Sequence, residues 1–121
     1  MSTPTPAISV IMSVKNGADC ISRSIASIQS QSFTDWEMLI CDDGSTDETY
    51  NRLCEIAEKD SRVRILRNKE SLGLAFSLNR CIEEAKSNIL ARQDADDWSA
   101  ENRFEVQYPF VFLVQFYKFF R

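Results

Sequence analysis

Residues 36–47 read WEMLICDDGSTD, an apolar run that ends abruptly in acidic and small polar residues. The run at 36–41 has the length and composition of a strand buried on both faces, which favours a parallel sheet. The turn that follows, at 42–44, carries two carboxylates, and residues 45–48 have the S-x-x-E pattern of a helix capping box. This stretch therefore predicts a strand, an acidic turn and a capped helix.

The rest of the chain continues this alternation of short apolar runs and amphipathic segments. Further apolar runs lie at residues 7–14, 63–66 and 88–92. The segments between them place apolar residues at helical spacing, namely Ile21, Ile25 and Ile28; Tyr50, Leu53, Cys54 and Ala57; and Ala75, Leu78, Ile82 and Ala85. Because the connections are long enough only for crossover helices, the pattern predicts an α/β fold with a parallel sheet and right-handed crossovers.

Composition narrows the chemistry that this chain can perform. The 121 residues are 44% hydrophobic and 26% charged, with a net charge of −4, which is typical of one globular domain and argues against a nucleic-acid partner. The absence of histidine excludes Ser-His-Asp and Cys-His catalysis and His-ligated zinc. Proton transfer or metal binding must therefore depend on carboxylates.

The cysteines and the N-terminus bear on location. The four cysteines show no CxxC spacing, and we interpret them as small buried hydrophobes in a reducing cytosol. The first residues contain no recognisable secretory signal, and no apolar run is long enough to span a membrane. We expect a cytoplasmic protein, or one held peripherally at the inner face of the membrane.

Acidic side chains follow two of the predicted strands. Asp42 and Asp43 follow the second strand, and Asp94, Asp96 and Asp97 follow the fourth. Ligands of open α/β sheets bind at the carboxyl ends of the strands, so we expect both clusters to share one edge. Clustered carboxylates are costly without a cation, and Mg²⁺ or Mn²⁺ takes oxygen ligands that substrate phosphates commonly complete.

Each acidic cluster also has a simpler explanation. Residues 94–97 could form a solvated acidic turn, since aspartate is common in turns. The pair at 42–43 could merely precede the capping box. The functional alternative is that Asp43 accepts a hydrogen bond from the imide N–H of a pyrimidine or guanine base, because an ionised carboxylate is a pure acceptor.

Other classes of nucleotide-binding protein fit less well. The three glycines form neither GxGxxG nor GxxxxGK[ST], which argues against dinucleotide and P-loop sites. A sugar nucleotidyltransferase would need a glycine-rich loop after the first strand. A receiver domain would need an acidic pair after the first strand and an aspartate after the third, whereas the acids here follow the second and fourth.

Five segments, taken in order and spacing, resemble the start of family 2 glycosyltransferases. They are residues 8–16, 27–33, 36–47, 73–80 and 91–97, and residues 102–104 also fit. The resemblance covers residues 7–107. It implies a Rossmann-like GT-A half-domain, with a parallel sheet and crossover helices, that binds a nucleotide-diphosphate sugar, most often UDP-linked.

The resemblance also implies an activity and a set of site residues. The activity is inverting transfer of a sugar to an acceptor hydroxyl of a sugar or glycan, in polysaccharide or glycoconjugate synthesis. Mn²⁺ or Mg²⁺ would stabilise the departing diphosphate, and a carboxylate from a later strand would act as general base. By position, the nucleotide-sugar site comprises Ser13, Lys15, Asp43, Arg80 and Asp94, and the metal ligands are Asp94 and Asp96.

The chain departs from the family pattern in three ways. Lys15 stands where an aromatic residue is common, and Cys81 stands where glycine is usual. Nothing after residue 107 resembles the family, so the general base cannot be assigned. The alternative function is therefore that of a truncated, non-catalytic nucleotide-sugar-binding module.

The two ends of the chain carry further expectations. We expect residues 1–6 to be disordered. Residues 108–121 form an aromatic-rich tail that is a packed helix or strand, a foreign segment, or a membrane-surface anchor. With strand order 3-2-1-4, the fourth strand would lie at an uncovered edge, so self-association through this edge or the tail is expected.

Overall fold

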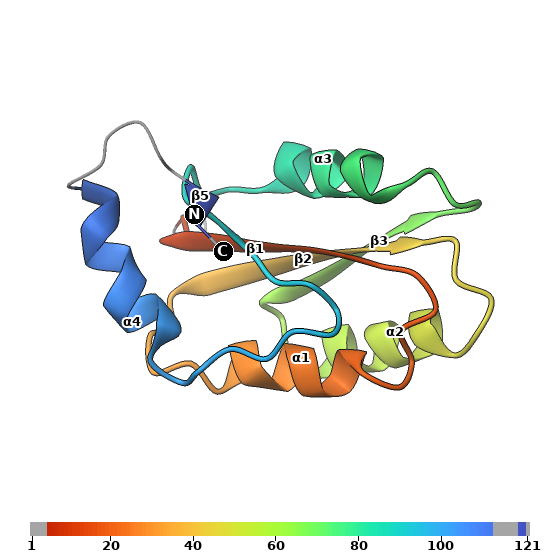
Figure 1. The fold of residues 1–121 in the computed structure, drawn as a ribbon, viewed down its shortest axis with the longest axis horizontal. Coiled ribbons are helices and arrows are strands. Elements are labelled where there is room, and N and C mark those ends of the chain that lie inside the picture. Colours follow the sequence, from red (N-terminus) through yellow and green to blue (C-terminus); the bar gives the residue numbers. More distant parts are fainter. Residues whose placement is uncertain (1–4, 113–118, 121) are drawn as a thin grey trace.

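The computed structural model describes residues 5–112 and 119–120, which form a parallel sheet with helices on both faces (Figure 1). The strands follow the order β3-β2-β1-β4-β5, and every pairing between neighbours is parallel. In chain order the elements are β1 (Ile8–Val14), α1 (Ile21–Gln29), β2 (Trp36–Asp43), α2 (Thr49–Lys59), β3 (Val63–Asn68), α3 (Leu74–Glu84), β4 (Leu90–Arg92), α4 (Arg103–Gln107), the 3-10 helix η1 (Tyr108–Phe112) and β5 (Phe119–Phe120).

The helices divide between the two faces of the sheet because strands are added on one side of β1 up to β3 and on its other side from β4 onward. Helices α1 and α2 cover one face, and α3 covers the other (Figure 1). Strand β1 pairs with β2 on one side and with β4 on the other, so the strand order reverses between β1 and β4. The parallel α/β fold and the order 3-2-1-4 are thus confirmed, and the reversal creates the position where such sheets bind ligands.

Two apolar clusters hold the layers together. The larger lies between the sheet and α1, where alternate residues of β1 and β2 meet the three isoleucines of α1, Leu53 and Phe104. The smaller lies under α3 and joins Ile11, Leu39, Cys41 and Cys81. Side chains alternate between the faces of a strand, which explains why the central strands read as continuous apolar runs.

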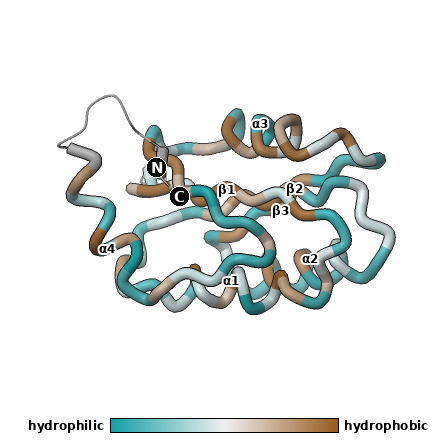
Figure 2. Tube along the Cα trace, viewed as in Figure 1, coloured by the Kyte–Doolittle hydropathy of each residue, from teal (hydrophilic) through white to brown (hydrophobic). Residues whose placement is uncertain are grey.

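The buried side of α3 differs from the side that its apolar spacing predicts. Leu78 and Ala85 pack against the sheet, but Ala75 and Ile82 are exposed. The fully buried positions of the helix are Ser77 and Cys81 instead. The serine hydroxyl donates to the Gly73 carbonyl and accepts a hydrogen bond from Asn68, so a polar residue is stable there. Hydrophobic residues therefore remain on the outside of α3, as Figure 2 shows in brown.

The predicted capping box before α2 is wrong. Helix α2 begins at Thr49, four residues after the serine that was expected to cap it. The hydroxyl of Ser45 accepts from the backbone N–H of Asn16, and the backbone N–H of Thr49 donates to the Asp47 carboxylate. Contact with the β1–α1 loop takes the serine away from the helix.

The expectation that the fourth strand forms an edge is also wrong. Leu90 and Ala91 of β4 pair with Phe119 and Phe120 of β5. Half of the aromatic tail, at 113–118 and 121, and residues 1–4 of the segment expected to be disordered lie outside the described residues. Within the described part of the chain, no helix has both the length and the apolar character that crossing a membrane requires.

Candidate functional site

Two loops at the carboxyl end of the sheet are locked together by hydrogen bonds. Asn16 has a φ of 51°, a left-handed conformation that asparagine tolerates better than most residues. Its side-chain oxygen accepts from the backbone N–H of Thr46 at 2.8 Å. The backbone N–H of Gly17 donates to the Thr49 hydroxyl at 2.9 Å. The loop after β1 is therefore fixed to the loop after β2, which explains the small polar residues in both.

A cavity of about 370 Å³ opens where the strand order reverses. Its walls come from the end of β1, the start of α1, the start of α3 and the loop after β4. Ser13, Lys15, Asp94 and Asp96 line it, together with Val14, Asn16, Gly17, Cys20, Leu74, Arg92 and Ala95. Four of the residues that the sequence assigns to a nucleotide-sugar site are thus brought to one cavity, from segments about 80 residues apart in the chain.

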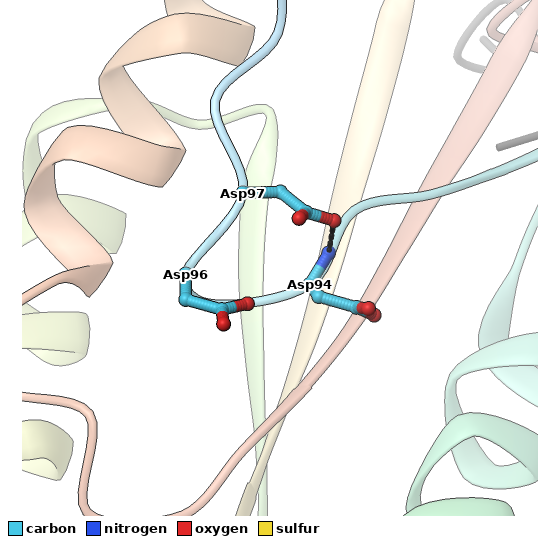
Figure 3. A group of neighbouring side chains, drawn as sticks. All are labelled: Asp94, Asp96 and Asp97. Atoms are coloured by element: carbon cyan, nitrogen blue, oxygen red, sulfur yellow. Dashed lines mark hydrogen bonds between the residues drawn. The ribbon is translucent and has the colours of Figure 1, made fainter.

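The loop after β4 carries three carboxylates on a single turn. Oxygen atoms of Asp94, Asp96 and Asp97 lie within 4.8 Å of one another (Figure 3). The backbone N–H of Asp94 donates to the Asp97 carboxylate at 3.1 Å, which closes the turn. Arg92 Nε donates to Asp94 Oδ1 at 2.8 Å. The Asp96 side chain is the exposed member.

The three carboxylates fit a divalent cation. Mg²⁺ prefers six oxygen ligands at about 2.1 Å, which places those oxygens about 3 to 4 Å apart. The three carboxylates each place an oxygen within 4.8 Å of the others, which is near enough for them to share one ion. Substrate phosphates and water commonly supply the remaining ligands of such ions. Residues 94–97 therefore have the chemistry of a Mg²⁺ or Mn²⁺ site.

Gln93 anchors the acidic turn to α1. Its side chain is 1% exposed, and its Nε2 lies within 3.5 Å of four acceptors, which are Ser24 O, Ser24 Oγ, Ser27 Oγ and Asp97 O. Its Oε1 accepts from the Ser99 hydroxyl at 2.7 Å and from Arg103 Nη1 at 3.1 Å. A buried amide with all of its hydrogen-bonding groups engaged holds a loop in one position. Gln93 thus fixes the turn that carries the carboxylates to helix α1.

Asp43 lies beside the cavity but does not line it. Its two oxygens accept four hydrogen bonds, with distances of 2.7 to 3.1 Å, from Asn68 Nδ2, Ser71 Oγ, Leu72 N and Gly73 N. Burial raises the pKa of Asp43, but these hydrogen bonds outweigh burial and lower the pKa to about 2. Asp43 therefore orders the loop between β3 and α3. The loop leads directly into Leu74, the first residue of α3, which lines the cavity.

Asp42 and Arg80 also lie outside the cavity wall. Asp42 is fully buried on the other face of the sheet, and its Oδ2 is 3.9 Å from Arg67 Nε. Arg80 Nη1 donates to Arg67 O at 2.9 Å and to Asn68 Oδ1 at 2.7 Å. Because Asn68 in turn donates to Asp43, the Arg80 guanidinium stabilises the Asp43 network indirectly, through Asn68.

Sequence reasoning did not assign several residues of the site. Cys20 and Leu74 line the cavity, and Gln93 holds the turn. Asp97, which the sequence placed in the acidic cluster but not among the two metal ligands, completes the acidic turn. Burial, followed by the nearby Asp96 and Asp19 charges, raises the pKa of Cys20. A polar residue directly after an apolar strand was the available signal for Gln93. The positions of Cys20 and Leu74 follow from tertiary packing, which apolar spacing alone does not reveal.

Known proteins with similar sequences are glycosyltransferases by name. EpsE of Bacillus subtilis (strain 168), named as a glycosyltransferase, is 42% identical over 107 residues, which cover 88% of this chain and 38% of EpsE. WfgD of Escherichia coli, a UDP-Glc:alpha-D-GlcNAc-diphosphoundecaprenol beta-1,3-glucosyltransferase, is 36% identical over 100 residues, which cover 83% of this chain and 39% of WfgD. The chain thus spans about two fifths of these relatives.

Solved structures share the fold. TarS (residues 1–349) from S. aureus, in complex with UDP-GlcNAc, superimposes with a TM-score of 0.80 at 21% identity, over 88% of this chain and 31% of that one. The mannosyltransferase PcManGT from Pyrobaculum calidifontis, in complex with GDP-Man and Mn²⁺, gives a TM-score of 0.71 at 27% identity, over 82% of this chain and 30% of that one. The Rossmann-like GT-A fold is confirmed.

A family model also matches most of the chain. The model described as glycosyl transferase family 2 matches residues 9–111, from the second residue of β1 into η1. This range includes every residue of the cavity wall and of the acidic turn. The chain belongs to glycosyl transferase family 2.

Proposed function

We propose that this chain binds the donor of a glycosyltransferase that moves a sugar from a nucleotide diphosphate, most often UDP, to an acceptor hydroxyl. The single observation that carries the proposal is the cavity where Ser13 and Lys15, at the end of β1, face Asp94 and Asp96, after β4. A cation site beside a lysine suits a diphosphate, which needs positive charge on more than one side. The named donors of WfgD and PcManGT support this class of ligand.

Each residue of the cavity has a distinct proposed role. Asp94 and Asp96, with Asp97 beside them, would hold Mn²⁺ or Mg²⁺, which when bound acts as a Lewis acid toward the departing diphosphate. Lys15 would supply a second positive charge from the loop after β1, and Ser13 a hydroxyl. The resemblance assigns the general base of the inverting reaction to a region beyond residue 107, so we assign donor binding, and no general base, to the residues of this cavity.

Asp43 enters the proposal with a changed role. The resemblance assigns it to the nucleobase, yet its four hydrogen bonds already occupy both oxygens. A base imide would therefore have to share an oxygen with, or replace, one of the loop donors. We infer that Asp43 and Arg80 support the donor site chiefly by ordering residues 68–73.

A second candidate function is binding of a nucleotide sugar without transfer, because no residue of the donor cavity is assigned as the general base. The chain spans 38% and 39% of the relatives EpsE and WfgD. A chain with the donor cavity alone would bind nucleotide sugar without transferring the sugar. The two functions differ in one assay, because an enzyme releases UDP from UDP-sugar over time, whereas a binding module returns the donor unchanged.

The acceptor and the location are further parts of the proposal, and the name of one relative supports the first of them. The name of WfgD gives its acceptor as a sugar linked to diphosphoundecaprenol, a lipid carrier. We propose a glycan or glycolipid acceptor and a position in the cytoplasm or at the inner face of the membrane. Self-association through the aromatic tail stays a prediction.

Calorimetric titration of the chain with UDP tests the donor site. With Mn²⁺ present, the native chain should bind UDP, and chelation of the metal should weaken binding at least tenfold, equivalent to about 1.4 kcal/mol. Asp96→Ala should lose the same metal-dependent increment. The matched control is Asp35→Ala, which removes an exposed carboxylate just before β2, at the opposite edge of the sheet. Unchanged metal-dependent binding in Asp96→Ala would refute the proposed ligands.

A further inference from the structure

A second cavity, of about 520 Å³, adjoins the donor cavity. Arg92 belongs to the walls of both cavities. Asp97 lines the second cavity, while its neighbours Asp94 and Asp96 line the donor cavity. The acidic turn therefore separates two hollows that open on either side of one candidate cation site.

An exposed indole dominates the second cavity. The Trp98 side chain is 60% exposed, although large aromatic side chains are usually well buried. It lines this cavity and also a smaller hollow of about 290 Å³ on its α1 side. Val106, 53% exposed, adds a second apolar surface. The cavity thus has an open aromatic face with room beside it.

Some hydrogen-bonding groups around this indole are engaged within the protein, and others are available to a ligand. Arg103 is fixed, since it donates to Gln107, Gln93, Ser99 and the Arg92 carbonyl at 3.0 to 3.2 Å. Burial lowers the pKa of Arg103, and the Asp97 charge opposes that effect. Within the described residues, the Trp98 indole N–H and the Asn102 amide have no hydrogen-bond partner, and Arg92 uses only Nε, toward Asp94.

We propose that this second cavity, the Trp98 cavity, binds a pyranose ring of the acceptor. A pyranose offers an apolar face of C–H groups that packs on an indole, and a rim of hydroxyls that both donate and accept hydrogen bonds. Arg92, Asn102 and the indole N–H supply planar donors at the rim, and the volume lies within the range of small-molecule sites. The inference rests on the proposed function, because an acceptor must lie beside the donor to receive its sugar.

The two tryptophans make the proposal directly measurable. Trp36 is 2% exposed and Trp98 is 60% exposed, so iodide quenching and the indole N–H resonance report on Trp98 separately. The probes are methyl α-D-N-acetylglucosaminide and methyl β-D-glucoside, titrated into the native chain with UDP and Mn²⁺ present. Inositol serves as a polyol without a glycoside. We expect one methyl glycoside to shift the Trp98 resonance saturably and to halve its quenching, and inositol to do neither.

Substitutions separate stacking from general effects. Trp98→Ala should abolish the saturable binding of the glycoside, and Trp98→Phe should retain part of it, because a smaller ring still offers an apolar face. Because Trp98 is 60% exposed, its replacement removes little buried contact, and UDP titration of each variant verifies that the donor cavity is intact. Asn102→Ala should weaken glycoside binding several-fold while leaving UDP binding unchanged.

Four outcomes would overturn the inference. If UDP binds but neither glycoside perturbs Trp98, the Trp98 cavity is not an acceptor site, while the donor proposal stands. If inositol acts as well as the glycosides, the site has no preference for pyranosides. If the Trp98 resonance moves with protein concentration instead of glycoside, a second copy of the chain covers the indole. Failure of UDP binding itself would refute the proposed function and the inference together.

Discussion

At the scale of single residues, Asp43 is the most constrained carboxylate of the described site. Four donors surround it, one at the end of β3 and three from the loop that follows, and Arg80 supports the strand donor, Asn68. Removing the negative charge while keeping the shape of the side chain would leave some of these donors facing an N–H group. An unmade buried hydrogen bond costs more than a made one contributes.

Asp43→Asn should therefore reduce stability in a pH-dependent way. The pKa of Asp43 falls from 3.8 to about 2 on folding. A depressed folded-state pKa stabilises the protein above the unfolded pKa, and this contribution disappears as the pH falls toward 2. We expect Asp43→Asn to lower the free energy of unfolding by about 2 kcal/mol at pH 7. Urea denaturation at pH 7 and pH 3 measures the change.

The control for this prediction is Asp35→Asn, at an exposed position. Its effect should be small at both pH values. The gap between wild type and Asp43→Asn should narrow at pH 3. A gap that stays constant across this range would mean that the hydrogen-bonded network does not depend on ionised Asp43.

Lys15 provides a second test at this scale. It lines the donor cavity together with Asp94 and Asp96, where a positive charge would interact with phosphate. Lys15→Met should weaken UDP binding about tenfold, or about 1.4 kcal/mol, and leave uridine binding unchanged. Lys15→Arg should restore most of the loss. Lys59→Met, which removes an exposed lysine at the end of α2, keeps the same net charge change. An equal loss for uridine and UDP would contradict a phosphate role.

At the scale of elements, the turns at the carboxyl edge depend on particular backbone conformations. Gly44 has a φ of 70°, and a Cβ there would lie 2.7 Å from the backbone of Glu70 and Ser71. Gly73 has a φ of 98°, but a Cβ there would meet no atom within 4 Å. A side chain at either position would therefore strain the backbone, and only at Gly44 would the Cβ also clash with neighbouring atoms.

Alanine at these positions should separate strain from contact. Gly73→Ala should cost about 1 to 3 kcal/mol from backbone strain alone. Gly44→Ala should cost more, because residues 70–71 would have to move as well. Urea denaturation of both variants gives the comparison. Equal losses would show that the β3–α3 loop yields freely.

Sequence patterns predicted the elements better than they predicted the contacts of those elements. Strand and helix positions followed from periodicity, because burial of alternating layers imposes that periodicity. The buried face of α3 was missed, since Ser77 and Cys81 are buried through hydrogen bonds and small size. The capping box was missed because Asn16, from another loop, takes the Ser45 hydroxyl. A local pattern does not show when a distant segment forms a hydrogen bond with a residue that the pattern assigns to another role.

At the scale of the whole molecule, the reversal at β1 gathers residues that are distant in the chain. Chain order and right-handed crossovers were enough to predict that the acids after β2 and β4 share one edge. They were insufficient to predict which acids reach the cavity. Side chains of adjacent strand residues point to opposite faces, so Asp42 is buried on one face while Asp43 orders a loop on the other.

Ligands that bind the folded state alone should stabilise the whole molecule. UDP with Mn²⁺, at a hundredfold excess over the dissociation constant, should add about 2.7 kcal/mol to the free energy of unfolding. Scanning fluorimetry should show a higher melting temperature with both ligands than with either one. Chelation of the metal should reverse the gain, and Asp96→Ala should show none. Equal stabilisation by UDP with and without metal would argue against a cation at residues 94–97.

Because Arg92 lines both cavities, it can couple the binding of a ligand in one to the binding of a ligand in the other. One guanidinium contacts Asp94 on the donor side and forms part of the wall on the Trp98 side. If occupancy of one cavity reorients this side chain, the affinity of the other changes, and each ligand must alter the affinity of its counterpart by the same factor. The order in which two substrates arrive would then affect the rate of assembly of the ternary complex, but not its final free energy.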